Sequence, residues 1–209
     1  MRRTFVLFLL FFFTGASVYS QISAITNTGD EVILYDDGTW EYVKEQIESQ
    51  RILINNRKFE KSESSTFLVE SKKLNIGIWI DPKMWKFSKD KQSEVTELFF
   101  EHRKKDLYGM LITEKIQIPV EKLRGIALEN ARSAAPDTKV VKEEYRMVND
   151  TKVLMMQMIG TIQGIKFTYY GYYYSNKNGT VQLVSYTGQN LFEEYKNDIE
   201  VFLNGFVET

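Results

Sequence analysis

The sequence predicts an α+β fold, an antiparallel sheet with a helix on each face, preceded by a small three-strand meander. The second half of the chain holds four segments of alternating apolar residues joined by tight turns, which is typical of an antiparallel sheet. Amphipathic segments with apolar residues at three- and four-residue spacing lie before and after these strands. Such segments are expected to dock as helices on the sheet.

The N-terminus has the composition of a cleavable secretory signal over residues 1–20. Arg2 and Arg3 give a positive start, an unbroken apolar run follows at residues 5–13, and small residues lead to Ser20. Spanning a bilayer takes roughly 20 apolar residues, and the core of this run is about half that length. We expect cleavage before Gln21, export to the periplasm or the medium, and no transmembrane segment after cleavage.

The composition limits the chemistry that the mature chain can use. The chain has no cysteine and a single histidine, so it has no disulfide framework, no lipid-bearing cysteine and none of the usual thiol or zinc arrangements. A formal charge of -1 argues against nucleic-acid binding, because such proteins usually carry a basic excess. We therefore expect an ordinary apolar core, no metal site and no cofactor.

Glycine-containing turns divide residues 21–43 into three short strands. The pattern Gly-x-x-Val-x-Leu-x-x-Asp-Gly-Thr-Trp, from Gly29 to Trp40, resembles a hairpin near the N-terminus of many bacterial exported proteins. This resemblance implies no particular chemistry, and the pattern favours a turn closed by an aromatic plug over a ligand site. Residues 44–64 are polar and charged apart from a short apolar stretch at 52–54, which predicts a linker before a domain at residues 65–209.

The first strands of this domain lead to a helix. Residues 95–102 fit either a strand or one face of a helix, and we favour the strand because residues 107–118 clearly alternate. Pro119 then opens a helix expected over residues 120–134. Earlier strands are expected at 65–70, 74–80 and 84–87.

A meander and a closing helix complete the chain. Residues 152–162 are apolar on both faces, so both faces of the sheet need a cover. The closing helix is expected over residues 190–206, where one apolar stripe runs as far as Phe206. The meander strands are expected at 138–148, 151–161, 165–175 and 180–187.

The order of these elements can be followed by short sequence markers. They are Trp79-Ile80-Asp81-Pro82, Gly109-Met110, the Pro119 helix, Gly171-Tyr172-Tyr173-Tyr174 and Leu203-Asn204-Gly205-Phe206. Over residues 65–206 this layout resembles the PsbP-like α/β/α sandwich, a family that includes an extrinsic protein of the photosynthetic oxygen-evolving complex and a Ran-binding import factor. The resemblance implies an accessory or binding role rather than catalysis, and it transfers no site residue.

Tyrosines supply the candidate binding residues. Strand alternation places Tyr170, Tyr172 and Tyr174 on one face. Their rings could present an aromatic surface to a peptide, a glycan or a partner protein. The alternative, favoured because both sheet faces need a cover, is that they pack beneath the closing helix with their hydroxyls at its edge.

The leading functional hypothesis is an exported, non-catalytic accessory or binding protein of the bacterial cell envelope, with an unknown protein or glycan partner. One alternative is a hydrolase whose site is built around His102, Glu101 and Asp106, since a histidine beside carboxylates can act as a base. Another is a structural subunit that self-associates through an exposed sheet edge.

Overall fold

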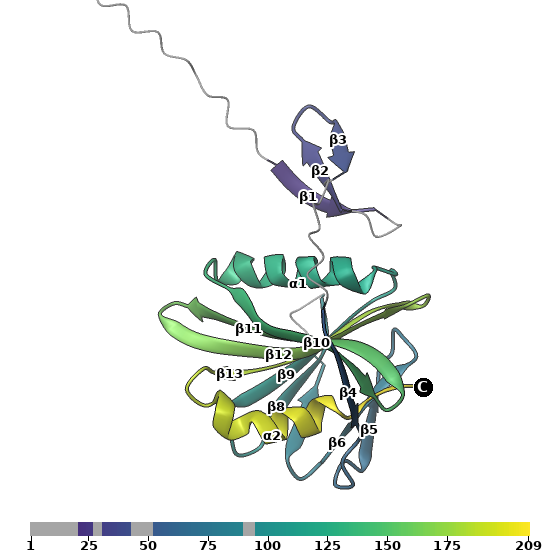
Figure 1. Ribbon diagram of the computed structural model, residues 1–209, viewed down its shortest axis with the longest axis vertical. Helices are drawn as coiled ribbons and strands as arrows, with labels where there is room; N and C mark the ends of the chain where they lie inside the picture. The colour runs from purple at the N-terminus through teal and green to yellow at the C-terminus, as the bar shows by residue number, and fades with distance from the viewer. Residues whose placement is uncertain (1–20, 27–30, 43–51, 90–94) are drawn as a thin grey trace, which may run out of the picture.

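The computed structural model describes residues 21–26, 31–42, 52–89 and 95–209 (Figure 1). The expected signal at residues 1–20 and the first part of the predicted linker lie outside the described residues. Three short antiparallel strands form the N-terminal sheet, in agreement with the predicted meander. They are β1 (Gln21–Ile25), β2 (Glu31–Tyr35) and β3 (Trp40–Tyr42).

An eight-stranded sheet forms the centre of the fold, in the order β4-β10-β11-β12-β13-β9-β8-β7. All neighbouring strands are antiparallel except β4 and β10, which run parallel. The ambiguous segment is a strand, as predicted. The bounds are β4 (Ile54–Phe59), β7 (Trp85–Ser88), β8 (Thr96–His102), β9 (Leu107–Glu114), β10 (Lys139–Val148), β11 (Thr151–Ile162), β12 (Ile165–Asn176) and β13 (Gly179–Gly188).

Helix α1 (Val120–Ala134) contacts β11 and β12, and helix α2 (Phe192–Leu203) contacts β12, β13 and β6. Figure 1 shows α1 above and α2 below the strands. Leu154, Met156 and Met158 of β11 pack in the α1 core, whereas Val153 and Met155 pack in the α2 core. Both faces of β11 are therefore buried, as its two apolar faces predict. No helix among the described residues is long and apolar enough to cross a membrane.

A third sheet, of three antiparallel strands, packs in the same apolar core as α2. It was not predicted from the sequence as a separate sheet. Its strands, in spatial order, are β14 (Phe206–Glu208), β6 (Ile76–Ile80) and β5 (Phe67–Glu70). The predicted closing helix runs to residue 206, but α2 ends at Leu203. After α2 the chain turns onto β6, and it approaches so closely that a Cβ on Gly205 would lie 2.0 Å from the carbonyl oxygen of Trp79. The Trp79 N–H also donates to the Gly205 carbonyl at 2.8 Å.

The predicted linker at residues 44–64 needs a correction, because residues 54–59 form β4, a strand of the main sheet. Among the strands that the structure describes, β4 pairs only with β10 and lies at the edge of the sheet. An edge strand buries few of its side chains, and within β4 only Phe59 is fully buried. Its sequence therefore lacks the apolar alternation by which a strand is recognised.

Candidate functional site

The three candidate tyrosines lie beneath α2 and β14 rather than on an open surface. Tyr170 and Tyr172 are each only 1% exposed, and Tyr174 is half-buried. The Tyr170 hydroxyl donates to Glu200 at 3.0 Å and the Tyr172 hydroxyl donates to Asn204 at 2.7 Å. Burial raises the pKa of Tyr172 to about 12. The three rings do not form an exposed aromatic surface, and the packing alternative describes their positions.

The hydroxyls of Tyr170 and Tyr172 meet the guanidinium of Arg146, whose side chain is 3% exposed. Arg146 donates to Tyr170 at 2.8 Å, to Tyr172 at 3.2 Å and to Glu144 at 2.7 Å. It lies 3.4 Å from a Glu200 oxygen and 4.3 Å from the centre of the Phe59 ring. A buried cation is tolerated only when its donors find acceptors, and these partners supply them.

The surroundings of Glu144, a carboxylate that accepts a hydrogen bond from Arg146, favour its ionised form. Burial disfavours the charge on Glu144, but hydrogen bonds from Arg146 and Asn55 outweigh burial and lower its pKa. The Asn55 amide donates to Glu144 at 3.1 Å, which ties β4 to β10. This network was not predicted from the sequence. Its one local signal is that Arg146 lies two residues from the buried Val148, on the same face of a strand.

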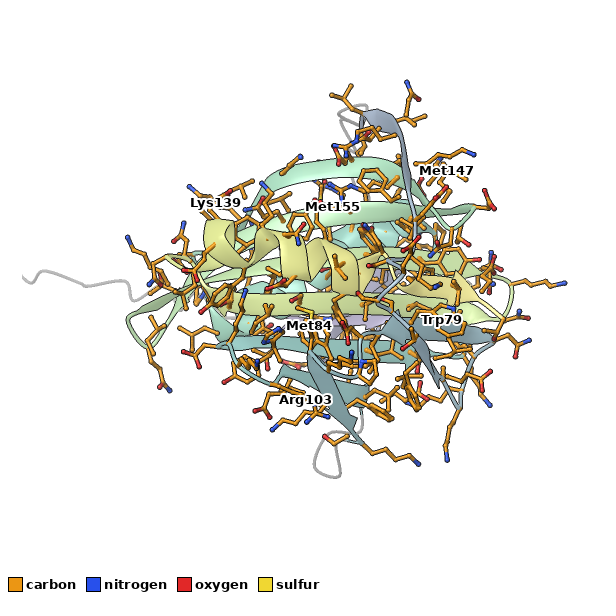
Figure 2. All side chains as sticks on the ribbon, turned by 90° about the horizontal axis from the view of Figure 1, so that it is seen from below. Trp79, Met84, Arg103, Lys139, Met147 and Met155 are labelled. Atoms are coloured by element: carbon orange, nitrogen blue, oxygen red, sulfur yellow. The ribbon has the colours of Figure 1, made fainter. Side chains whose placement is uncertain are left out.

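A groove with a volume of about 530 Å³ follows β4 and the turn between β10 and β11; we call it the β4 groove. Phe59 lines it and covers the Arg146 guanidinium, so the buried network supports the groove from below. Figure 2 labels Met147 beside the groove and Lys139 at the opposite end of β10. The lining residues are Ile54, Asn55, Asn56, Arg57, Lys58, Phe59, Glu60, Lys61, Met147, Asn149 and Asp150.

Asn149 fixes one end of the β4 groove. Its side-chain oxygen accepts from the Lys61 N–H at 2.9 Å. Its amide donates to the carbonyls of Asn204 at 2.7 Å and Phe206 at 2.8 Å. The β10–β11 turn is thereby joined both to the segment after β4 and to the end of α2. The amide of Asn149 is thus already engaged inside the fold and is not free to serve a ligand.

Three exposed cations line the β4 groove: Arg57, Lys58 and Lys61. Within the described part of the chain, none of them forms an ion pair. Arg57 lies over the Phe59 ring at 5.6 Å, and Lys61 lies over the Trp79 ring at 5.1 Å. The groove's carboxylates are those of Glu60 and Asp150. These side chains can bind negatively charged or hydrogen-bonding groups, but they include no activated nucleophile.

The residues of the hydrolase alternative do not come together. His102 is 5% exposed, accepts from the Lys104 N–H at 3.2 Å and meets Trp85 edge-on, with 5.3 Å between ring centres. Glu101 points to the opposite face of β8 and pairs with Lys86 at 2.9 Å. Asp106 is exposed in the turn after β8. Among the described residues, no cluster of three or more histidines and carboxylates could hold a metal.

One exposed aromatic pair lies on the N-terminal sheet. Ile22, Leu34 and Trp40 stand opposite one another across its three strands, and Tyr42 follows Trp40 on the same face. Trp40 and Tyr42 are both 54% exposed, with 5.2 Å between their ring centres. The expectation that Trp40 plugs its turn is therefore wrong. The Gly29–Trp40 pattern indicated the turn but not the face to which the ring points.

Burial makes His102 a pH-sensitive element. Burial lowers its pKa below the ordinary 6.5; Asp198 opposes this shift, and Lys105 and Lys104 add to it. Between the folded and unfolded pKa values the unfolded chain binds more protons, so stability falls as the pH drops through 6.5. We expect the wild type to lose more free energy of unfolding than His102→Asn between about pH 7.5 and pH 5.5.

Urea unfolding at the two pH values measures this difference. Asparagine is the matched replacement because its side-chain oxygen can accept from the Lys104 N–H in place of the imidazole. An equal loss of stability in both proteins would show that His102 does not titrate differently in the folded chain.

Comparisons with known proteins identify a fold rather than an activity. No family model and no curated protein matches the sequence. The solution structure of cyanobacterial PsbP (CyanoP) from Synechocystis sp. PCC 6803 matches with a TM-score of 0.53 and 10% identity, over 71% of this chain and 95% of that one. A protein of unknown function from Pseudomonas aeruginosa, described as a putative regulator, matches with a TM-score of 0.41 and 11% identity, over 64% of this chain and 90% of that one. In fold, this chain therefore resembles PsbP, as the order of its elements predicts.

Proposed function

We propose that this chain is an exported, non-catalytic accessory or binding protein of the bacterial cell envelope, and that it binds its partner in the β4 groove. The export step rests on the signal-like residues 1–20 and would place the protein in the periplasm or the medium. The proposed scaffold is a PsbP-like α/β/α sandwich with one helix on each face. The positions of α1 and α2 in Figure 1 support this arrangement.

The proposal rests on three cations that form no ion pair among the described residues and that line a groove whose floor packs on the buried Arg146. Arg57, Lys58 and Lys61 are exposed beside a groove whose floor, Phe59, rests on the buried Arg146. Among the described residues these cations form no ion pair, although Lys61 donates to the Ser65 carbonyl at 3.3 Å, so their charge can attract and orient a negatively charged ligand. A floor that does not move limits the loss of conformational entropy on binding. The tyrosine row contributes by holding Arg146, not by contacting a partner.

Reversing the charge of the groove tests this proposal. We expect the mature chain, residues 21–209, to capture a specific protein or glycan from an envelope extract of its own organism. Arg57→Glu combined with Lys58→Glu should reduce that capture by about tenfold or more, because attraction becomes repulsion. Both residues are exposed, so the variant should fold, and circular dichroism checks this.

Lys139→Glu is the matched control, since it changes an exposed charge at the opposite end of β10. It should capture the partner as the wild type does. Undiminished capture by the groove variant would place the binding surface elsewhere and contradict the proposal.

A second candidate function, a self-associating structural subunit, is favoured by the apolar face of the N-terminal sheet. Ile22 is 59% exposed, Leu34 is 38% exposed, and Trp40 and Tyr42 extend the same face. Contiguous exposed apolar side chains on a soluble protein mark an interaction surface. Two copies could bury this face against each other as two packed sheets.

Light scattering coupled to size-exclusion chromatography tests the second candidate. If the candidate is correct, the mass of the wild type should rise with protein concentration, whereas Trp40→Ser should remain monomeric. The matched control is Tyr35→Phe, because the Tyr35 hydroxyl bonds to Glu41 on the other face of the sheet. A wild type that is monomeric over a wide concentration range would exclude this function.

A further inference from the structure

The β4 groove follows a strand at the edge of the main sheet. Among the described strands, β4 is the last of its sheet and pairs only with β10, so no other described strand lies on its second side. All eight consecutive residues from 54 to 61 line the groove, which therefore follows the whole length of β4. The edge of a sheet presents backbone N–H and C=O groups that can pair with an added strand.

The backbone of β4 is anchored to the sheet at both ends. The Leu53 carbonyl accepts from the Tyr145 N–H at 2.8 Å, and the Phe59 carbonyl accepts from the Asn149 N–H at 3.0 Å. Between these anchors the register moves from Asn55 opposite Arg146 to Lys58 opposite Met147. Two residues of β4, 56 and 57, thus have no partner on β10 and bulge from the ladder.

The side chains along this edge change from apolar to cationic. Leu53 is 77% exposed and Ile54 is 61% exposed at the start of the strand. The three cations follow at positions 57, 58 and 61, with one carboxylate, Glu60, among them. Arg57 and Lys58 are adjacent and Lys61 follows three residues later, so the cations lie in a row along the chain. Their spacing fits a linear ligand that carries several negative charges.

We propose that the β4 groove takes an acidic peptide segment in extended conformation, which adds as a strand to the outer edge of β4. This inference rests on the proposed function and names the class of partner. Main-chain hydrogen bonds to β4 hold the segment, its carboxylates meet Arg57, Lys58 and Lys61, and an apolar side chain covers Ile54. The groove accommodates a segment of about six residues, since an extended chain rises about 3.3 Å per residue.

Labelled peptides test the inference by fluorescence anisotropy with the mature chain. The probe is a short peptide of alternating glutamate and valine. A second peptide carries lysine in place of glutamate, and a third keeps the glutamates but has proline in place of valine, which removes N–H donors without changing the charge. We expect the acidic peptide to bind the wild type and Lys139→Glu, and to bind about tenfold or more weakly to Arg57→Glu with Lys58→Glu.

The proline peptide should also bind about tenfold or more weakly than the valine peptide, because strand addition needs its N–H groups. Equal binding of the two acidic peptides would overturn strand addition, because attraction between charges would then be enough to explain the binding. Equal or tighter binding of the lysine peptide would overturn the acidic partner class. If no peptide binds but the groove variant still loses the captured envelope partner, the strand inference fails while the proposed function stands. If the groove variant keeps that partner as well, both fail.

Discussion

The burial of one positive charge organises this fold. The Arg146 guanidinium is almost removed from water, and a charge in that position is stable only if hydrogen bonds and opposite charge replace the water. Its partners come from separate elements: Glu144 from β10, Tyr170 and Tyr172 from β12, and Glu200 from α2. Phe59 of β4 closes the site from above. Four elements must therefore be in place together for the charge to be satisfied.

The same interaction connects the core to the candidate binding surface. Phe59 both covers Arg146 and forms the floor of the β4 groove, and Asn55 joins β4 to Glu144. Asn149 adds a second link, from the groove to the end of α2. The groove is consequently a rigid surface feature, although most of its own side chains are exposed. The exposed cations are the part of this arrangement that remains available to a partner.

Periodicity in the sequence was enough to predict the elements whose burial is strong. The 120–134 helix and the two buried faces of β11 follow from apolar spacing. The spacing at residues 95–102 fitted a strand or a helix, and the clear alternation at 107–118 favoured the strand that the structure has. β4 could not be found this way, because an edge strand carries little burial signal. β14 was not predicted because the apolar spacing of the closing helix continues to Phe206, and the segment becomes a strand only by pairing with the distant β6. Arg146 was missed because most of its partners lie far away in the sequence.

The free energy of unfolding of Arg146→Met, measured by urea denaturation, tests the central role of this charge most directly. Methionine keeps much of the volume but removes the Arg146 hydrogen bonds to two tyrosine hydroxyls and to Glu144, which keeps its hydrogen bond from Asn55, so we predict a loss of about 3–5 kcal/mol. The control Arg132→Met removes an exposed cation paired with Glu129 and should cost less than about 1 kcal/mol. A loss for Arg146→Met as small as that of the control would contradict the account.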